Sequence, residues 1–563
     1  MFNPAEKFDV IVVGSGASGL TAALTAARLG AKVCLLERDA VLGGTTALSG
    51  GWMWIPNNHL ARELGRADSL EDARAYLQAE CGAYFDEARV EAFLRHGPRM
   101  LEYLAREVGI ELLLGEFPDY HPLVAGSSAG ARSLCAAPFD AKQLGTDRKL
   151  LRPPLRTMTL FGLPVMAGKD LHHFYNATRS WRSASYVVQR LLRYGHDLLR
   201  YGANTRLVNG TALVAHLYRA ARAAGVDIRV STPVTGLVQE ASRVSGVRVA
   251  GQAGTLLAER GVILACGGFS HDANRRQLLY PHERMTPGHY SPVPASIDGA
   301  GMRLAVEASG VLEDNYPHAA AWAPVSLVPQ GDGGTELFVH FVDRPKPGFI
   351  AVTRAGHRFV NEANSYHDFI AALLSLSPEP GTEAFLLCDH PTLRKYGMGA
   401  VKPAPFPIRK WLRNGYLQQA NTLGELARRL GIDGAALDDT VQHYNLGAIE
   451  GRDRQFGKGE NVYNRYLGDP QHQPNPNVGP LRTPPYYAVR LVPGDLGTYA
   501  TLRTDARARV LRAEGTAVDG LYAVGNDMAS IMGGAYPGPG ITLGPGMTFG
   551  FIAAHDAITP DPH

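Results

Sequence analysis

Residues 9 to 19 read Asp9-Val-Ile-Val-Val-Gly-Ser-Gly-Ala-Ser-Gly19, an apolar run that ends in closely spaced glycines. The run predicts a buried parallel strand, and the alanine-rich segment that continues to about Leu29 predicts a helix directly after the turn. A second apolar run, residues 32–36, ends at Glu37, 18 residues after Gly19. Amides at a helix N-terminus receive a pyrophosphate, and a carboxylate at the end of the second strand accepts hydrogen bonds from ribose hydroxyls. The pattern therefore predicts a dinucleotide site.

A second loop of small residues, Gly43-Gly-Thr-Thr-Ala-Leu-Ser-Gly-Gly51, follows this acid. It resembles the pyrophosphate and flavin loop of the fumarate reductase and succinate dehydrogenase flavoprotein superfamily, which indicates FAD rather than NAD. Members that bind FAD covalently carry a His before the Thr of this loop, where this chain has Gly44, so we expect non-covalent FAD. The first set of expected cofactor contacts is Gly14, Gly16, Ala17, Ser18, Gly19, Glu37, Arg38, Gly44, Thr45, Thr46, Ser49, Gly50 and Gly51.

Two later apolar strands also end in glycine, in the segments 260–269 and 520–526. They resemble the crossings that bring the chain of such flavoproteins back under the cofactor. Residues 546–558 predict a helix whose positive N-terminal end faces the flavin and stabilises its reduced, anionic form. The second set of expected cofactor contacts is Val234, Ala265, Gly267, Gly525, Asn526, Thr542 and Leu543.

The composition is that of a nearly neutral, reduced protein. Its 563 residues exceed one core, and a formal charge of +3 with dispersed basic residues argues against a nucleic-acid partner. The five cysteines are odd in number and widely spaced, so we expect neither a disulfide framework nor a metal site. Residues 1–9 are mixed in charge and the apolar run 10–13 is too brief for a signal sequence or membrane span, which predicts a cytoplasmic location.

The strands predicted near residues 9, 32, 228, 261 and 521 must build one α/β domain from both ends of the chain. We expect a Rossmann-like FAD-binding domain, with a parallel sheet and helices, at residues 1–318 and 488–563. An α+β cap domain for the substrate is expected at residues 319–487, with helices at 423–430 and 435–450. The substrate site should lie in the cleft between the two domains.

Residues 140–210 look like a helical insertion rich in Arg and aromatic residues. Within it, residues 183–201 alternate apolar and basic side chains at helical spacing, which predicts a basic amphipathic helix. Such a helix lies on a membrane, grips a partner, or packs on its own protein with its charged face in solvent. Packing on the protein is the commoner outcome, and peripheral membrane contact, which would suit a lipid-soluble substrate, stays open.

Tyr536 lies in the glycine- and proline-rich run 533–546. Such a run lets the main chain approach a ligand closely while one phenol points out of the loop. Three segments, 117–122, 361–366 and 536–540, resemble the active-site segments of the 3-ketosteroid Δ1-dehydrogenases, a branch of the same superfamily. The resemblance implies a 3-ketosteroid substrate and a catalytic set of Tyr120, Tyr366, Tyr536 and Gly540.

Removal of two hydrogens from adjacent carbons beside a ketone needs an oxyanion site, a base and a hydride acceptor in one pocket. The resemblance implies that the Tyr536 hydroxyl and the Gly540 amide hold the 3-keto oxygen. It also implies that Tyr366 takes the C2 proton while the hydride from C1 passes to flavin N5. A free phenol has a pKa of about 10, so Tyr366 needs help, for which the resemblance suggests Tyr120 as a hydrogen-bonding neighbour.

Three other functions stay open. A 3-ketosteroid Δ4-(5α)-dehydrogenase shares the fold, but its C-terminal loop tends to carry Tyr-x-Ser where this chain has Tyr536-Pro-Gly538. A fumarate-type reductase of an unsaturated acid needs paired His and Arg, and segment 494–498 lacks the His pair while the Tyr536 loop lacks the Arg. A flavin-binding electron-transfer or scaffold subunit would leave the three tyrosines without a purpose. A quinone-type electron acceptor is expected, since no second nucleotide motif is evident.

Overall fold

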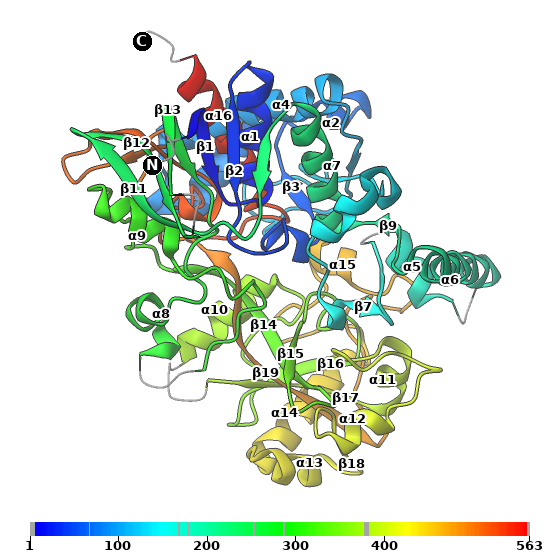
Figure 1. Ribbon diagram of the computed structural model, residues 1–563. Helices are drawn as coiled ribbons and strands as arrows, with labels where there is room; N and C mark the ends of the chain where they lie inside the picture. The colour runs from blue at the N-terminus through cyan, green and yellow to red at the C-terminus, as the bar shows by residue number, and fades with distance from the viewer. Residues whose placement is uncertain are drawn as a thin grey trace.

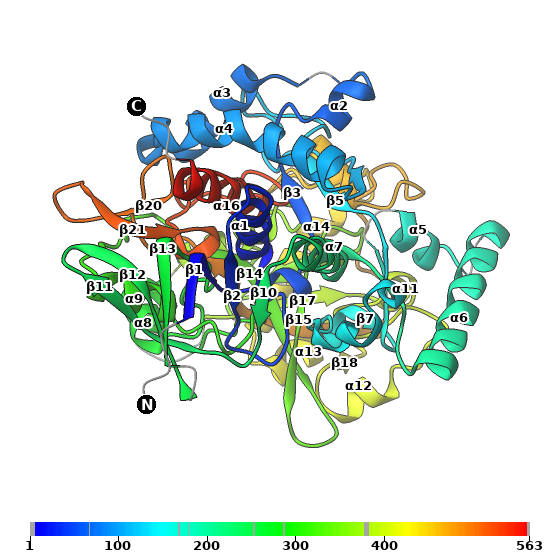
Figure 2. The same cartoon turned by 45° about the horizontal axis from the view of Figure 1, so that its top comes forward.

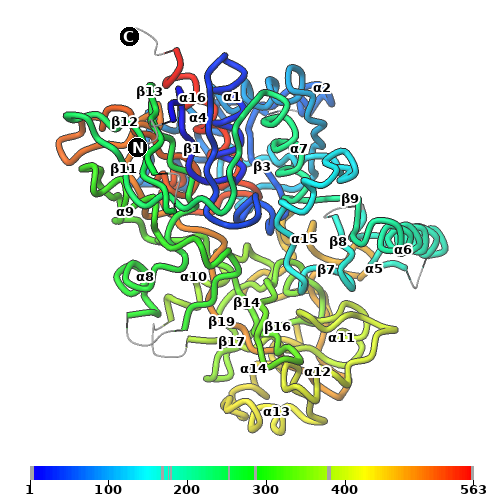
Figure 3. Tube along the Cα trace, viewed as in Figure 1, coloured from blue at the N-terminus to red at the C-terminus, as the bar shows by residue number. Residues whose placement is uncertain are grey.

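A computed structural model of the chain describes residues 6–66, 68–166, 169–177, 180–251, 254–284, 288–376 and 382–559. These residues form two lobes and a helical projection (Figure 1). The upper lobe in this view holds segments from both ends of the chain, and the lower lobe holds most residues between about 320 and 490, as the trace in Figure 3 shows. The expected discontinuous α/β architecture is confirmed.

The upper lobe is built on a largely parallel sheet. Its strand order is β10 (Asp227–Arg229), β2 (Val33–Leu36), β1 (Glu6–Val13), β13 (Thr255–Leu264), β12 (Arg243–Val249) and β11 (Val234–Glu240). In addition, β21 (Ala517–Ala523) pairs with β13 and with β20 (Arg509–Leu511). The strands β1, β2, β10, β13 and β21 run parallel, as predicted. Val13 lies opposite both Leu36 and Leu264, so the loops that follow these three strands open at one edge of the sheet. Ligands of open α/β sheets bind at this edge.

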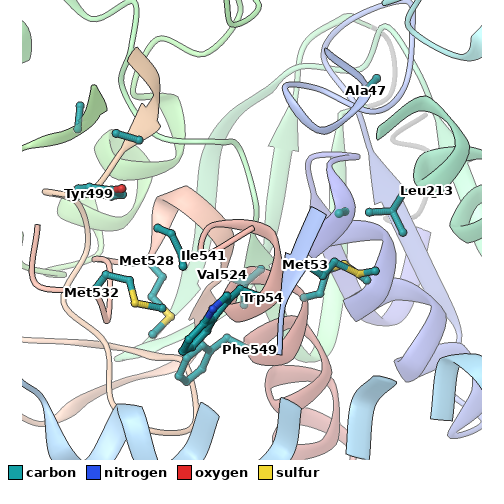
Figure 4. Close-up of a cluster of buried hydrophobic side chains, with 14 of the residues drawn as sticks. Ala47, Met53, Trp54, Leu213, Tyr499, Val524, Met528, Met532, Ile541 and Phe549 are labelled. Atoms are coloured by element: carbon teal, nitrogen blue, oxygen red, sulfur yellow. The ribbon is translucent and has the colours of Figure 1, made fainter. Parts of the chain in front are cut away.

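Helices cover one face of this sheet. Figure 2 shows α1 (Ala17–Arg28), α7 (Asn209–Ala223) and α16 (Leu543–Ile558) on the same side of β1 and β2, with α4 (Glu87–Glu102) against α16. The central β1 residues 10–12 are fully buried, because an apolar side chain on either face meets packed atoms. Figure 4 shows Trp54, Met528, Ile541 and Phe549, from distant parts of the sequence, gathered in this core. The C-terminal helix is thus fixed beside the first loops of the chain.

Smaller elements complete the upper lobe. A three-stranded antiparallel sheet has the order β3 (Trp52–Trp54), β5 (Ser133–Ala136), β4 (Leu112–Leu114). Further helices are α2 (His59–Glu63), α3 (Leu70–Cys81) and α9 (Ala300–Glu307), while α8 (Ala273–Leu279) lies at the level of the lower lobe in Figure 1.

The lower lobe contains an antiparallel sheet and helices. The strand order is β15 (Thr335–Val339), β14 (Ala320–Pro329), β19 (Tyr486–Thr498), β17 (Ala384–Cys388), β16 (Phe349–Val352), with β18 (Gln418–Ala420) also paired to β19. The helices are α10 (Tyr366–Leu376), α11 (His390–Tyr396), α12 (Arg409–Arg413), α13 (Leu423–Leu430), α14 (Gly434–Ala448) and α15 (Val462–Leu467). Strand β15 contacts the insertion, where Thr157 Oγ1 donates to the Leu337 carbonyl at 2.5 Å.

The expected domain limits stay a prediction. The boundary proposed between residues 487 and 488 falls inside β19, whose 13 residues belong to the lower sheet. The C-terminal helix α16 begins at Leu543, three residues before the predicted start at Gly546. Its first turn is therefore formed by residues of the glycine- and proline-rich run 533–546.

The insertion projects to one side of both lobes (Figure 1). It contains the strand pairs β6 (Phe139–Asp140) with β9 (Arg206–Leu207) and β7 (Thr159–Leu160) with β8 (Leu163–Pro164), then α5 (Lys169–Tyr175) and α6 (Trp181–Tyr201). α6 covers the predicted amphipathic segment. None of the helices in the described ranges has the length and apolar character that a bilayer span requires.

Candidate active site

A cavity of about 640 Å³ opens at the edge of the parallel sheet and continues between the lobes. The four predicted catalytic residues line it, and so does every predicted cofactor contact except Gly19. The structure therefore brings together, in one space, residues separated by more than 500 positions in the chain. The roles of these residues stay proposals, because position in a cavity does not by itself assign chemistry.

Gly19 has a packing position instead. A Cβ at this residue would lie 2.1 Å from the Gly14 carbonyl oxygen, so only glycine lets α1 approach the preceding loop. Gly14 itself has φ +111° and a Cβ there would lie 2.2 Å from the Ala265 carbonyl oxygen. The two glycines set how closely the first turn of α1 approaches the ends of β1 and β13.

Glu37 is buried at the nucleotide end of the cavity, and its carboxylate is held on both oxygens. Ser15 donates to Oε2 through its amide (3.1 Å) and its hydroxyl (2.5 Å), and the Asp39 amide donates to Oε1 (2.9 Å). Ser15, which was not among the predicted contacts, thus fixes the acid that is expected to accept hydrogen bonds from ribose hydroxyls. The position of Ser15 between Gly14 and Gly16 is the sequence signal that could have identified it.

The two later crossings are joined by Asp527. Its buried carboxylate accepts hydrogen bonds from the amides of Cys266 (2.5 Å) and Gly268 (3.0 Å). Burial raises the pKa of Asp527 to about 6, although these amides oppose the shift. This acid, also missed from the sequence, fixes the loop after β13 to the loop after β21.

The residues present fit FAD. Gly14, Gly267 and Gly525 have φ values of +111°, +96° and +63°, a region of backbone angles that favours glycine. No side chain therefore projects into the cavity from these three positions. Thr46 Oγ1 accepts from the Ala17 amide at 3.0 Å, which joins the second loop to the start of α1. With Glu37, the cavity thus combines a close main-chain approach, a helix N-terminus and a fixed carboxylate. Among the described residues, no cluster of three or more His, Cys, Asp or Glu could hold a metal.

Three tyrosines form a cluster where the lobes meet. The Tyr120 hydroxyl donates to the Tyr366 hydroxyl at 3.2 Å. The Tyr536 ring stacks on Tyr120, with centroids 5.6 Å apart, and meets Tyr366 edge-on at 5.1 Å. Tyr463, which lies in no motif of the sequence, also packs on Tyr120, with ring centroids 4.7 Å apart, and lines the cavity. The cluster joins a loop of the upper lobe, the start of α10 and the C-terminal loop.

Burial controls the acidity of these phenols. It raises the pKa of Tyr120 and of Tyr366 well above the ordinary value, and raises that of Tyr536 to about 12. Neither Tyr120 nor Tyr366 therefore rests as a phenolate near neutral pH. Because their hydroxyls share a hydrogen bond, loss of a proton belongs to the pair rather than to one ring.

His121 links the loops that carry the tyrosines. Its Nδ1 lies 2.7 Å from Glu80 Oε2 and its Nε2 lies 2.9 Å from Asp368 Oδ2, two residues beyond Tyr366. Burial alone would lower the pKa of His121, but hydrogen bonds to Asp368 and Glu80 outweigh it and raise the pKa to about 10. An imidazolium between two carboxylates thus holds the Tyr120 loop against α10.

Gly540, which lines the same cavity, has a backbone in the left-handed region, at φ +100°. A Cβ there would lie 2.6 Å from the Trp52 carbonyl group. Its carbonyl oxygen accepts from the amides of Trp54 (3.0 Å) and Gly544 (2.9 Å), while no group in the described ranges accepts from its own amide. The peptide is fixed, and its N–H is available as an oxyanion donor.

Comparison with known proteins places this geometry in a family. The model of the FAD binding domain family matches residues 9–543. A 4-oxocyclohex-2-ene-1-carboxylate 5-dehydrogenase of Sinomonas cyclohexanicum is 39% identical over 559 residues, which cover 98% of this chain and 94% of that protein. A 3-oxosteroid 1-dehydrogenase of Mycobacterium tuberculosis is 37% identical over 566 residues, 98% of each chain.

A solved structure has the same fold throughout. It is that of 3-ketosteroid Δ1-dehydrogenase from Sterolibacterium denitrificans in complex with 1,4-androstadiene-3,17-dione. The TM-score is 0.90 at 35% identity, and the match covers 98% of this chain and 100% of that one.

Proposed function

Since this chain belongs to the FAD binding domain family and is an FAD-dependent CH–CH oxidoreductase of the 3-ketosteroid and oxocyclohexene dehydrogenase type, we propose that it catalyses 1,2-dehydrogenation of a 3-ketosteroid. The observation that carries the proposal is the Tyr120–Tyr366–Tyr536 cluster in the wall of an apolar cavity. The family and the cofactor expected from the sequence are confirmed.

The oxyanion site is assigned to Tyr536 and Gly540. The Tyr536 hydroxyl and the Gly540 amide hold the 3-keto oxygen, and their hydrogen bonds strengthen as negative charge develops on that oxygen. This acidifies the C2 hydrogens. A protonated Tyr536 suits the role of donor, in line with the raised pKa of its phenol.

Tyr366 is assigned the removal of the C2 proton. Burial holds the pKa of Tyr366 high, so a phenolate forms there only with support. Tyr120, which donates to the Tyr366 oxygen at 3.2 Å, stabilises the negative charge that Tyr366 carries in proton transfer. When bound, FAD supplies the acceptor for the hydride that leaves C1.

The walls of the cavity suit a neutral, apolar body. They include Phe117 from the Tyr120 loop, Met158 and Leu171 from the insertion, and Phe341 and Leu467 from the cap. Among the described lining residues the cations are Arg38 and Arg303, and both pair with Asp298 near the nucleotide end. A fused hydrocarbon skeleton therefore finds apolar contacts beyond the tyrosines.

Gly538 supports Δ1 rather than Δ4 regiochemistry. A Cβ at Gly538 would lie 2.8 Å from Trp54 Nε1 and 3.2 Å from Asp119 Oδ1. Trp54 is fixed there by a hydrogen bond of 2.7 Å to Asp119. The loop therefore has no room for the serine that the Δ4 enzymes tend to carry at this place.

A second candidate substrate is an oxocyclohexene carboxylate, favoured by the relative that shares 39% identity. The ring reaction would be the same, because both substrates carry a cyclic enone, but the carboxylate would need a cation near the substrate end. Turnover with an artificial acceptor, measured in parallel on 4-androstene-3,17-dione and 4-oxocyclohex-2-ene-1-carboxylate, separates the two. A kcat/KM at least about tenfold higher for the steroid supports the proposal, and the reverse order would reject it. We also propose a quinone-type physiological acceptor, which reoxidation assays with soluble quinones test.

A further inference from the structure

Helix α6 turns its polar side to the protein. Its buried residues are Ser183, Arg190 and Asp197, which recur every seven positions, while Leu192 and Leu199 are 70% and 92% exposed. The expectation that this helix packs through its apolar side and leaves its charged side in solvent is therefore wrong. The orientation places the guanidinium group of Arg190 inside the protein.

Arg190 is a buried cation for which the described residues provide no partner. It is 8% exposed, and its Nε and Nη2 atoms are buried without a hydrogen bond. Arg152, Arg275 and Arg276 also have at least one buried nitrogen without a hydrogen bond, but each of them forms an ion pair with an acid. A buried charge with neither a hydrogen bond nor a counter-ion is strongly destabilising. An anion from outside the chain would complete this site.

Asp170 on α5 interacts with Arg190, but other groups already hold its carboxylate. Oδ2 pairs with Arg206 Nη1 at 3.1 Å, and Oδ1 accepts from the Tyr186 hydroxyl. Burial, and next the charge of Arg206, lower the pKa of Arg190, and the attraction of Asp170 does not offset them. Among the described side chains, one carboxylate thus faces two guanidinium groups, and one positive charge is left without a counter-ion.

The site of Arg190 adjoins a wall of the cavity. Leu171, the neighbour of Asp170 on α5, lines the cavity, and so does Val208, two residues after Arg206 of β9. Figures 1 and 2 both show α6 on the outer side of α5. α5 and the β9 segment thus carry residues of the cavity wall next to residues that surround Arg190.

The charge and chemistry of the site favour a carboxylate. A guanidinium group presents its donors in a planar fork that matches the two oxygens of a carboxylate. One carboxylate carries the single negative charge that the described side chains lack, whereas a phosphate group carries nearly two. The cavity wall in the insertion is apolar, with Met158 and Leu171, so the rest of the ligand should be hydrocarbon. A ketosteroid with an acidic side chain combines these properties.

We propose that Arg190, assisted by Arg206, forms a carboxylate subsite between α5, α6 and β9 that binds the acidic side chain of a 3-ketosteroid. The inference rests on the proposed dehydrogenation and adds the class of substrate to it. The ketone of such a substrate lies at Tyr536 and Gly540, and its side chain enters the insertion. The two arginines bind and orient the substrate and take no part in proton or hydride transfer.

The direct experiment compares 3-oxochol-4-en-24-oic acid with its methyl ester, two ketosteroids that differ in the charge at the end of the side chain. The ratio kcat/KM is measured for the FAD-loaded protein with an artificial acceptor. We expect the parent to prefer the acid by at least roughly tenfold, as for a hydrogen bond to a charged group. Arg190→Met should lower kcat/KM for the acid roughly 10- to 100-fold and leave that for the ester unchanged. Arg182→Met, at an exposed residue of the same helix, should behave like the parent.

A second readout separates ligand binding from a structural role. Removal of a structural arginine would destabilise the protein. Arg190→Met removes an unpaired buried charge instead, so the variant without ligand should unfold at the same or a higher temperature than the parent. The acid should raise the unfolding temperature of the parent more than the ester does, and this difference should vanish in Arg190→Met.

Equal preference for the acid over the ester in the parent and in Arg190→Met would overturn the proposal. So would stabilisation of the parent, but not of the variant, by inorganic phosphate while acid and ester behave alike, because the site would then hold a free anion. Turnover of the ester tests the proposed dehydrogenation separately. If neither the ester nor 4-androstene-3,17-dione is oxidised, that function fails, whereas the thermal measurement with the acid still decides whether the subsite exists.

Discussion

The hydroxyls of Tyr120 and Tyr366 lie 3.2 Å apart although their residues belong to different lobes. Tyr120 comes from a loop of the upper lobe, where its amide donates to the Pro537 carbonyl at 2.9 Å, and Tyr366 begins α10 of the lower lobe. The proposed base and its hydrogen-bond donor therefore meet only when the lobes are in contact. A change that separates the lobes should therefore lower turnover more readily than it weakens binding at the nucleotide end of the cavity.

Tyr366→Phe should lower kcat by about 10² to 10⁴, the range typical of a lost general base. The FAD absorbance and the Kd for a 3-ketosteroid product should change little, because the phenol ring and its packing remain. Steady-state kinetics and product titration measure both. Tyr444→Phe is the control, since Tyr444 is a buried tyrosine of the cap core that does not line the cavity. Substantial turnover by Tyr366→Phe would remove Tyr366 from the role of base.

Gly540→Ala should lower kcat about 10²- to 10³-fold, as for the loss of one oxyanion donor. The new Cβ would lie 2.6 Å from the Trp52 carbonyl group and would displace the peptide whose N–H is assigned to the keto oxygen. Gly515→Ala controls for left-handed strain, since Gly515 has φ +87° with open space around it. Equal kcat for the two variants would contradict the oxyanion role.

Glu37→Gln should weaken FAD binding roughly tenfold or more, because an amide can accept on one oxygen only and three donors converge on this carboxylate. Fluorescence titration of the apoprotein with FAD gives the Kd. Glu87→Gln, at a side chain 70% exposed, should leave that Kd unchanged. A Glu37→Gln protein with parental FAD affinity would show that this carboxylate does not recognise the ribose.

His121 should make stability fall at alkaline pH. Its folded-state pKa of about 10 lies above its ordinary value of 6.5, so its contribution is complete below about pH 6.5 and is lost as pH rises through 10. In His121→Gln that part of the pH dependence should disappear, and the free energy of unfolding near pH 6 should drop by about 2 kcal/mol, discounted for an imidazole 31% exposed. Denaturant unfolding between pH 6 and 10 measures this. Parallel pH curves for parent and variant would contradict the assignment.

The parallel strands followed from local patterns, whereas the four predicted catalytic positions rested on the resemblance to the 3-ketosteroid Δ1-dehydrogenases. Strand, glycine turn and helix are encoded within some 20 residues, and the Tyr536 loop carries its own glycines and prolines. Ser15 and Asp527 were missed because their partners, Glu37 and the amides of Cys266 and Gly268, are identified only once the loops meet. The role of His121 likewise depends on its partners Glu80 and Asp368, which are 41 and 247 residues away along the chain.

α6 shows a different limit of sequence reasoning. Helical periodicity predicts that Leu192 and Leu199 share a face, but not which face meets the protein. That choice depends on Thr205, His173 and Asp170, polar partners from neighbouring segments. The same polar contacts leave the apolar side exposed.

The most direct test of the proposed reaction is a single anaerobic turnover of the FAD-loaded protein with 4-androstene-3,17-dione, followed by flavin bleaching and by the mass and NMR spectrum of the product. We expect the flavin to bleach and the product to be 1,4-androstadiene-3,17-dione. Bleaching only with a saturated 5α-3-ketosteroid, with a 4-ene product, would contradict the Δ1 assignment, and no bleaching by either steroid would contradict a ketosteroid substrate.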